Sequence, residues 1–128
     1  MVDGASRGNP GDAGCGAMIC DENGVVVKEL SRYLGQVTNN VAEYEALLMG
    51  LDALIELGRN RIRVQSDSQL LVRQLNGEYR VKDEKLKVLF QRAKTLLRQF
   101  DAYRILHVYR EMNKLADKLA NRGIDEAI

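Results

Sequence analysis

The stretch Gly14–Leu34, GCGAMICDENGVVVKELSRYL, decides the fold class, because it predicts a β-hairpin near the start of the chain. Its two halves, Gly14–Asp21 and Val25–Leu34, are strand-like, and the segment ENG between them is a hairpin turn signal. A shorter segment that ends near Arg7 comes before them. We therefore expect a three-stranded antiparallel meander.

Helical and strand-like segments alternate after the meander. Gly58 and Gly77 are the C-terminal stops of two of the helices. The expected elements are a helix over Asn40–Leu57, a strand over Arg61–Asp67, helices over Ser68–Asn76 and Asp83–Gln99, a strand over Ala102–Arg110 and a helix over Asn113–Ala127. This order predicts an α/β fold with a five-stranded mixed sheet flanked by helices. The length of 128 residues fits a single domain over 1–128.

Composition places the chain among soluble globular proteins. Hydrophobic residues make up 45% of it and charged residues 29%, and no apolar run approaches the roughly 20 residues of a membrane span. The first residues lack the basic and apolar regions of a signal peptide. We expect a cytoplasmic protein that acts as a monomer.

The net charge of +1 hides an asymmetry along the chain. Residues 59–98 carry eleven Lys and Arg against four acidic residues, which gives +7, and the remainder gives −6. A basic lobe suits a polyanion, whereas an acidic lobe suits cations. Solvated helix faces also look basic, so the pattern supports a function only together with other features.

The two cysteines, Cys15 and Cys20, are not placed to form a disulfide with each other. Five residues apart in one strand, they are roughly 16 Å apart and on opposite faces. A disulfide needs Cα atoms within about 7 Å. We expect both to be small buried hydrophobic residues.

Four acidic residues, Asp3, Glu43, Asp67 and Asp117, lie at the seams of the expected elements. No Cys/His cluster accompanies them. Carboxylates from separate elements are the ligands that hard divalent cations such as Mg²⁺ require, because these ions prefer oxygen. The four together predict a magnesium site, with Mn²⁺ as the alternative ion.

Helical periodicity sets Glu43 apart from the other acids of its helix. At about 100° per residue, Glu45, Asp52 and Glu56 share one solvated stripe, and Glu43 points about 160° away from that stripe. It therefore faces the sheet, where an unpaired carboxylate is costly. The alternative is a capping box formed by Asn40 and Glu43.

Each of the other three acids also has a simpler structural explanation. Asp67 lies where a strand meets a helix, and Asp is a common N-cap residue. Asp117 borders the apolar face of the last helix and can equally be a solvated residue. Asp3 precedes a Gly-rich turn, where Asp commonly stabilises a bend.

The sequence disfavours other kinds of site. The loop Gly4–Gly11 lacks the GxxxxGK[ST] spacing, and no helix follows it, so it is not a P-loop. His107 lies within the fifth expected strand, where we expect a structural role. No Ser/His/Asp or Cys/His arrangement indicates a nucleophilic enzyme.

Four segments resemble, in order, the catalytic blocks of type 1 ribonuclease H. They are DGASRGNPG from Asp3, TNNVAEYEAL from Thr38, SDSQLLVRQL from Ser66 and VYREMNKLADKLA from Val108. The match covers essentially the whole chain. It implies a ribonuclease H-like fold in which Asp3, Glu43, Asp67 and Asp117 form the catalytic carboxylate cluster and bind the metal.

The resemblance also implies the substrate, an RNA/DNA hybrid, and the residues that contact it. Asn9, Asn39, Asn40 and Gln69 match positions that contact the nucleic acid through its minor groove. The further candidate substrate contacts are Gly4, Ser68, Arg80, Lys82, Arg110 and Asn113.

The chain departs from the family pattern in three places. Only Met1 and Val2 precede Asp3, so we expect a short first strand. The segment Gly77–Asp83 stands where many members carry a basic, Trp-rich protrusion, so substrate binding relies on scattered basic residues. The loop before the last helix is reduced to Arg110–Met112 and lacks the family's mobile histidine. This short form resembles the branch found in archaea and some bacteria, some of whose members also cut double-stranded RNA.

The activity that the resemblance implies is endonucleolytic hydrolysis of the RNA strand of RNA/DNA hybrids by two-metal-ion catalysis. A catalytically impaired nucleic-acid-binding domain of the same fold is the alternative. A fragment of an actin-like ATP-binding protein would share the sheet topology. That class needs a second domain, which 128 residues do not provide.

Overall fold

Five strands and four α-helices make up most of the chain in a computed structural model, which describes residues 1–127. The strands are β1 (Val2–Gly8), β2 (Gly11–Cys20), β3 (Val26–Val37), β4 (Arg61–Ser66) and β5 (Ala102–His107). The helices are α1 (Asn39–Glu56), α2 (Gln69–Leu75), α3 (Glu84–Leu97) and α4 (Lys114–Ala127), with a 3₁₀ helix, η1 (Arg110–Asn113), before α4. The order of strands and α-helices expected from the sequence is confirmed. Within residues 1–127, no helix combines the length and the apolar character that crossing a membrane requires.

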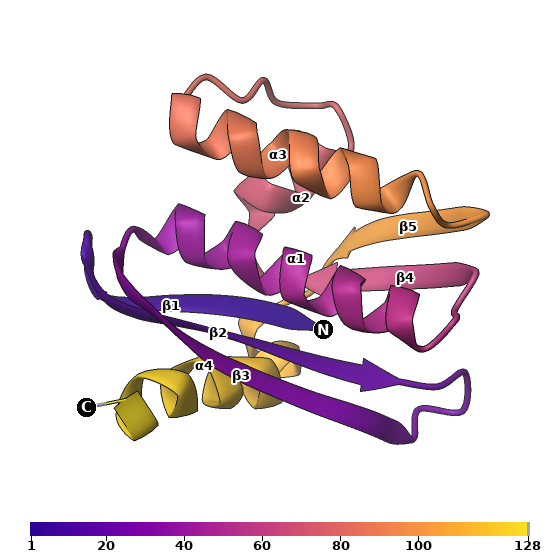
Figure 1. The fold of residues 1–128 in the computed structure, drawn as a ribbon, viewed down its shortest axis with the longest axis horizontal. Helices are drawn as coiled ribbons and strands as arrows, with labels where there is room; N and C mark the ends of the chain where they lie inside the picture. Colours follow the sequence, from indigo (N-terminus) through magenta and orange to yellow (C-terminus); the bar gives the residue numbers. More distant parts are fainter. Residues whose placement is uncertain (128) are drawn as a thin grey trace.

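The strands form one mixed sheet in the order β3-β2-β1-β4-β5. The first three strands are antiparallel, as expected of the meander, whereas β4 runs parallel to β1 and β5 runs parallel to β4. Figure 1 shows α1 and α3 on one face of the sheet and α4 on the other. The predicted α/β fold class is therefore confirmed.

The predicted strand ends differ from the observed ones. The β2–β3 pairing continues to Gly11 and Val37, beyond the predicted ends at Gly14 and Leu34, and it passes a register shift on the way. A bulge inserts one extra residue into one strand without ending the pairing, so β2 and β3 continue past it. β5 ends at His107, before the predicted end, because the chain turns into the 3₁₀ helix η1.

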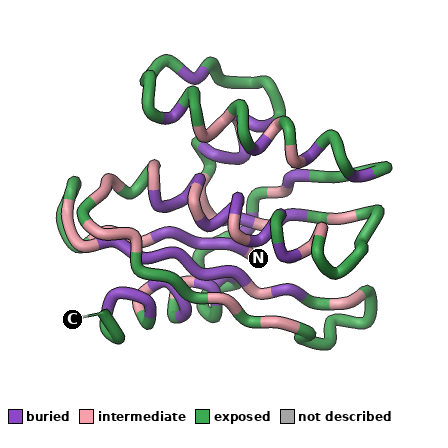
Figure 2. Tube along the Cα trace, in the orientation of Figure 1, coloured by how far each residue is buried: buried purple, intermediate pink, exposed green. Residues whose placement is uncertain are grey.

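The main core lies between the sheet and α1. Ala46, Leu47 and Leu51 of α1 are almost fully buried, and Ala93 and Leu97 of α3 belong to the same hydrophobic cluster. Figure 2 shows this buried strip in purple along the inner side of α1 and the centre of the sheet. The core fixes the rotation of α1, and hence the direction of every side chain on its inner face.

The two cysteines lie in different environments. Cys15 is fully buried, and its sulfur lies 4.0 Å from that of Met49, whereas Cys20 is exposed. Both are free, as expected. The expectation of two buried cysteines is wrong for Cys20, because this residue ends β2, where the register with β3 shifts.

Two glycines of β2 let α4 approach the opposite face of the sheet. A Cβ on Gly16 would lie 2.5 Å from the carbonyl oxygen of Ala116, and one on Gly14 would lie 2.2 Å from that of Ala120. Any larger residue would therefore push α4 away. Because α4 carries Asp117, these glycines set the distance between that carboxylate and the sheet.

Gly16→Ala should destabilise the protein by about 1–3 kcal/mol, because the added methyl group overpacks β2 against α4. Urea unfolding measures the effect as a lower midpoint at an unchanged m-value. Gly50→Ala in α1 is the matched control. Its Cβ would lie 3.3 Å from Cγ1 of Val2, a side-chain atom that can shift, and alanine is favoured over glycine in a helix by about 1 kcal/mol. Equal losses in the two variants would contradict the assigned role of Gly16.

Candidate active site

Three of the four predicted carboxylates meet at the seam between β1 and β4. Asp3 is the second residue of β1, Glu43 lies in the second turn of α1, and Asp67 directly follows β4. One carboxylate oxygen of each lies within 4.8 Å of the others. The parallel bridge between Val2 and Ser66 explains part of this arrangement, because it sets the next residue of each strand side by side.

Gly4 brings α1 onto β1 and so brings Glu43 to the other two carboxylates. A Cβ on Gly4 would lie 2.2 Å from the carbonyl carbon of Ala42 and 2.4 Å from the backbone nitrogen of Glu43. Gly4 is buried, and its backbone N–H lies near enough to the Glu43 carboxylate to oppose the rise of that group's pKa. The residue therefore positions the site, and its contact with substrate stays a prediction.

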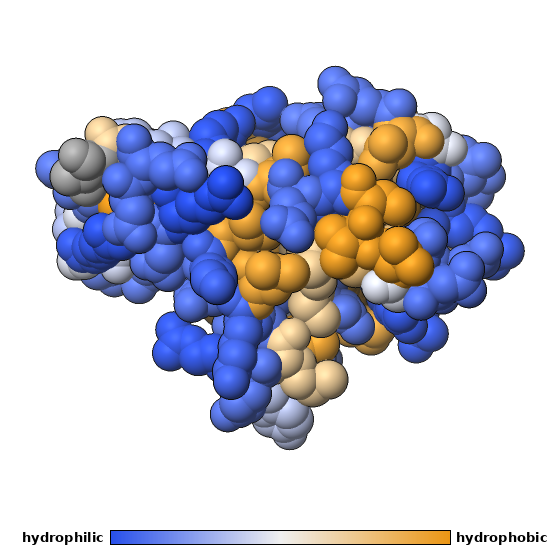
Figure 3. Space-filling view, turned by 90° about the horizontal axis from the view of Figure 1, so that it is seen from below, coloured by the Kyte–Doolittle hydropathy of each residue, from blue (hydrophilic) through white to orange (hydrophobic). Residues whose placement is uncertain are grey.

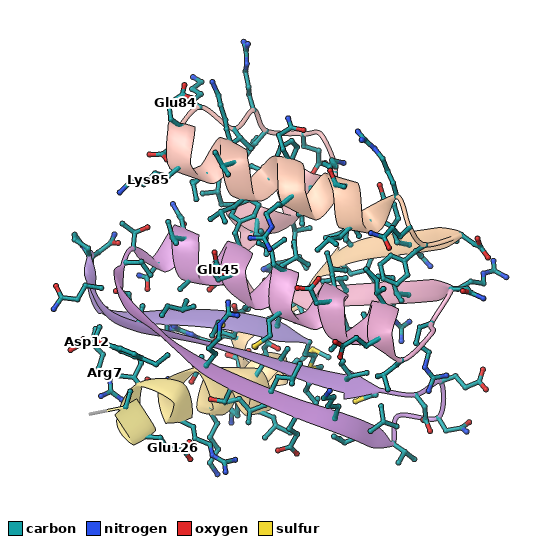
Figure 4. The ribbon with its side chains drawn as sticks, viewed as in Figure 1. Arg7, Asp12, Glu45, Glu84, Lys85 and Glu126 are labelled. Atoms are coloured by element: carbon teal, nitrogen blue, oxygen red, sulfur yellow. The ribbon has the colours of Figure 1, made fainter. Side chains whose placement is uncertain are left out.

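Glu43 faces the sheet, as helical periodicity predicted. Its exposed fraction is 9%, whereas Asp52 and Glu56 of the same helix are exposed. Glu45 is half-buried and pairs with Arg32 of β3 at 2.9 Å, and Figure 4 labels it on α1. The inward direction of Glu43 is thus specific to this residue among the acids of α1.

The capping-box alternative for Glu43 is wrong. The N-cap of α1 is Thr38, whose Oγ1 accepts a hydrogen bond from the backbone N–H of Val41 at 3.3 Å. Asn40 is instead an exposed residue of the first turn. The Glu43 carboxylate is therefore not engaged in closing the helix end.

The capping alternative for Asp67 is wrong as well. The N-cap of α2 is Ser68, whose Oγ accepts a hydrogen bond from the backbone N–H of Leu71 at 3.2 Å. This arrangement frees the Asp67 side chain to lie with Asp3. It also gives the Ser68 hydroxyl, a predicted substrate contact, a partner within the protein.

Asp117 lies beside the group of three. It is half-buried on α4 rather than freely solvated, and it is close enough to Asp3 for the two to share a hydrogen bond when one is protonated. It does not belong to the compact group in which the oxygens lie within 4.8 Å of one another. Asp3 thus lies near Glu43 and Asp67 on one side and near Asp117 on the other.

The site holds more negative charge than its surroundings favour. Burial raises the pKa of Asp3 far above its usual range, and the charges of Glu43 and Asp67 raise it further. Burial also raises the pKa of Glu43, although hydrogen bonds from Asp3 and Gly4 and the positive charge of Arg110 oppose this rise. Both carboxyls therefore resist ionisation in the metal-free protein.

The residues of the site fit a hard divalent cation. Oε2 of Glu43 is buried and has no hydrogen-bond partner within residues 1–127. A cation would supply that partner and would offset the repulsion between carboxylates. The donors are all oxygens, which suits Mg²⁺ or Mn²⁺ better than a softer metal.

Two predicted substrate contacts, Asn9 and Asn39, are joined by a hydrogen bond at the start of α1. The backbone N–H of Asn39 donates to Oδ1 of Asn9 at 3.2 Å, and that of Ser6 donates to Oδ1 of Asn39 at 2.8 Å. Both asparagines are exposed, as are Asn40 and Gln69. Ser6 positions the side chain of Asn39, a role that was not predicted. The one sequence feature that pointed to it is its place in the Gly-rich turn.

The remaining predicted contacts divide into buried and exposed residues. Asn113 is fully buried, and its Nδ2 donates to the Val2 carbonyl oxygen at 2.9 Å, so it ties η1 to β1, and its contact with substrate stays a prediction. Arg110 is exposed in η1, near enough to act on Glu43. Arg80 and Lys82 are exposed between α2 and α3, just before Glu84 and Lys85, which Figure 4 labels at the start of α3.

The fold and this carboxylate cluster together define a ribonuclease H-like protein, and comparison with known proteins agrees. A family model described as reverse transcriptase-like matches residues 1–123. Ribonuclease HI of Halobacterium salinarum is 43% identical over 98% of this chain and 63% of its own length. The crystal structure of RNase H1 from that archaeon has a TM-score of 0.95 at 42% identity, and the match covers 98% of this chain and 95% of that one. The chain belongs to the type 1 ribonuclease H family.

Two further relatives extend the comparison. The crystal structure of LC11-RNase H1 in complex with an RNA/DNA hybrid has a TM-score of 0.94 at 42% identity, and the match covers 98% of this chain and 95% of that one. A bifunctional protein of Mycobacterium tuberculosis is 42% identical over 98% of this chain and 35% of its own length. The chain thus spans less than two thirds of the curated Halobacterium and Mycobacterium proteins.

Glu43→Gln should change how stability depends on pH. Folding raises the pKa of Asp3 and Glu43, so the folded protein holds protons that the unfolded chain releases above about pH 4. Their contribution to the free energy of unfolding therefore falls as the pH rises, by at most about 1.4 kcal/mol per pH unit and group. Urea unfolding from pH 4 to 9 with a chelator present should show a shallower decline for Glu43→Gln than for the wild type.

Glu56→Gln is the matched control for this measurement, because Glu56 is an exposed residue of the same helix. Its pH dependence should follow that of the wild type. If Glu43→Gln also followed the wild type, burial of Glu43 would not be the cause of the decline.

Proposed function

We propose that the chain is a metal-dependent endonuclease that hydrolyses the RNA strand of RNA/DNA hybrids. The observation that supports this most strongly is the group Asp3, Glu43 and Asp67, whose oxygens lie within 4.8 Å of one another in a fold shared with an RNase H1 solved with a hybrid. Double-stranded RNA is a second candidate substrate. The cytoplasmic location and the monomeric state stay predictions.

The residues that would hold the metal follow from their contacts. Two Mg²⁺ or Mn²⁺ ions, when bound, supply an activated water, charge relief at the phosphorus and a stabilised leaving oxygen. Asp3 would bind both ions, because it lies between the group of three and Asp117. Glu43 and Asp67 would supply further ligands to the ion on the side of the attacking water. Asp117 would supply a further ligand to the other ion.

Recognition of the RNA strand would use amide side chains near the carboxylates. Oδ1 of Asn9 accepts from the backbone N–H of Asn39, and Oδ1 of Asn39 accepts from that of Ser6, so the side-chain NH2 groups of both asparagines would face a ligand. Asn40 and Gln69 are exposed at the starts of α1 and α2. Amides can reach the 2′-OH groups that RNA displays in its wide, shallow minor groove. Contacts to sugar and backbone carry no sequence information, so we expect cleavage without sequence preference.

The direct test is incubation with labelled RNA/DNA hybrid, double-stranded RNA and single-stranded RNA, each with Mg²⁺ or Mn²⁺. We expect cleavage of the RNA strand of the hybrid and none without a divalent ion. Binding of the hybrid without cleavage in either metal would favour the alternative, a catalytically impaired nucleic-acid-binding domain of the same fold.

Asp67→Asn should abolish metal-dependent cleavage while the protein stays folded, because it removes a metal-binding charge at nearly constant shape. Loss of several kcal/mol of transition-state stabilisation corresponds to a rate at least about a hundredfold lower. Initial rates on hybrid and far-UV circular dichroism measure the two effects. Asp52→Asn, an exposed carboxylate of α1, is the control and should keep its activity. Near wild-type activity of Asp67→Asn at saturating metal would falsify the assignment.

Asn40→Ala should slow cleavage of hybrid about two- to tenfold, because one uncharged hydrogen bond contributes about 0.5–1.5 kcal/mol. Asn40 is preferable to Asn39 for this test, because Oδ1 of Asn39 also holds the backbone of Ser6. Metal affinity, measured by titration without substrate, should be unchanged. Asn60→Ala, an exposed asparagine beyond the other end of α1, is the control. An unaltered rate for Asn40→Ala would mean that other groups recognise the RNA strand.

A further inference from the structure

The segment that links β5 to α4, residues 108–113, is fixed to the seam that carries the carboxylates. At its start, the backbone N–H of Val108 donates a hydrogen bond to the Ser66 carbonyl oxygen at 2.9 Å. At its end, Nδ2 of Asn113 donates to the Val2 carbonyl oxygen, also at 2.9 Å. Ser66 and Val2 each directly precede a carboxylate of the group of three. The linking segment is therefore bound to β4 and to β1 at the positions next to the site.

Tyr109, the second residue of the linking segment, has an exposed side chain. Its exposed fraction is 71%, the highest of the large hydrophobic side chains within residues 1–127. The ring of His107 packs against it edge to face, with the ring centroids 5.8 Å apart and the planes at 78°. A ring held in this way on a fixed backbone loses little freedom when a ligand contacts it.

The apolar surface continues beyond Tyr109 into η1 and α4. Met112 is 61% exposed, and Leu115 is exposed as well. Figure 3, which views the side of the molecule that carries α4, shows hydrophobic side chains in orange exposed among hydrophilic ones. The surroundings of the ring therefore suit a flat, largely apolar ligand group.

The charged residues that follow Tyr109 are mostly basic. Arg110, Lys114 and Lys118 are exposed, and Glu111 is the one exposed acidic residue among residues 108–118. Lys114 and Lys118 lie four residues apart on α4, so they share one side of the helix. This charge attracts phosphates. It also argues against a protein partner, because charged residues are depleted at the centres of protein interfaces.

An exposed aromatic ring among basic side chains is the arrangement by which proteins bind single-stranded nucleic acid. The basic groups contact phosphates, and the bases stack on the ring. Within a duplex, the neighbouring base pairs cover the faces of each base. A ring on the protein surface can therefore stack only on a base that has left the paired region.

We propose that Tyr109 stacks on an unpaired base of the RNA strand, at the place where that strand leaves the hybrid beside the carboxylates. This role rests on the proposed function, because it takes the hybrid as the ligand of the site. Tyr109 would favour substrates whose RNA strand continues beyond the paired region, and the basic side chains near it would contact the phosphates of that extension.

Binding of three hybrids with the same paired region tests this role. One hybrid is blunt, one has a short unpaired RNA extension at the 5′ or the 3′ end, and one has the same extension without its bases. The abasic extension keeps the phosphates, so it separates stacking from charge. The full chain carrying Asp67→Asn keeps the RNA intact, and fluorescence anisotropy of a label on the DNA strand measures Kd at constant salt.

We expect the extension with bases to bind about fivefold more tightly than the abasic one at one of the two ends, because stacking on an aromatic ring contributes at least this much. Tyr109→Leu should remove the difference. Tyr109→Phe should keep it, because phenylalanine retains the ring and loses only the hydroxyl. Tyr103→Leu is the matched control, since Tyr103 is an exposed tyrosine near the opposite end of β5, and it should keep the difference as well.

Equal binding of the extended and the abasic hybrids at both ends would overturn the assignment. So would a preference for the bases that persists in Tyr109→Leu, or a loss of affinity in that variant that is equal for all three hybrids. The last result would mean that the ring contacts the paired region. Each of these results leaves the hybrid bound by the unmodified ring, whereas failure of the proposed function would appear as no binding of any hybrid or no cleavage by the wild type.

Discussion

The backbone contact between Gly4 of β1 and Ala42 of α1 is the constraint on which the carboxylate cluster depends. α1 lies this close to the sheet because residue 4 has no side chain, and the contact sets Glu43 beside Asp3. Gly16 serves the same purpose beneath α4 on the opposite face. Glu43 and Asp117 are thus held by helices docked directly on sheet backbone, which positions side chains more accurately than loops do.

This close placement of like charges opposes folding, and other parts of the molecule must offset it. Burial and mutual repulsion disfavour ionised Asp3 and Glu43, whereas the apolar contact between α1 and the sheet favours the arrangement that brings them together. Arg110 lessens the repulsion at Glu43. Ionisation of the carboxyls and binding of a cation are therefore one linked equilibrium, in which each event makes the other more favourable.

Local sequence patterns predicted the features that depend on a single element. The inward direction of Glu43 follows from helical periodicity, and the place of Asp67 follows from the end of a strand. Several features that depend on contacts between two elements were missed. Asn113 is buried and Cys20 is exposed because of which segments cover them, and β3 reaches Val37 because β2 pairs with it. The separation of the carboxylates likewise requires the register between β1 and β4, which no local pattern contains.

Within residues 1–127, that register is a single bridge between Val2 and Ser66, and it joins two groups of strands, which we call plates. β1, β2 and β3 form an antiparallel plate, and β4 and β5 form a parallel one. Asp3 and Glu43 belong to the first plate, because α1 is docked on it, whereas Asp67 belongs to the second. Sliding of one plate along the other would change the gap between Asp3 and Asp67 directly. An ion bound by both would join the plates at this bridge, so the cation of the proposed nuclease would also oppose sliding of one plate along the other.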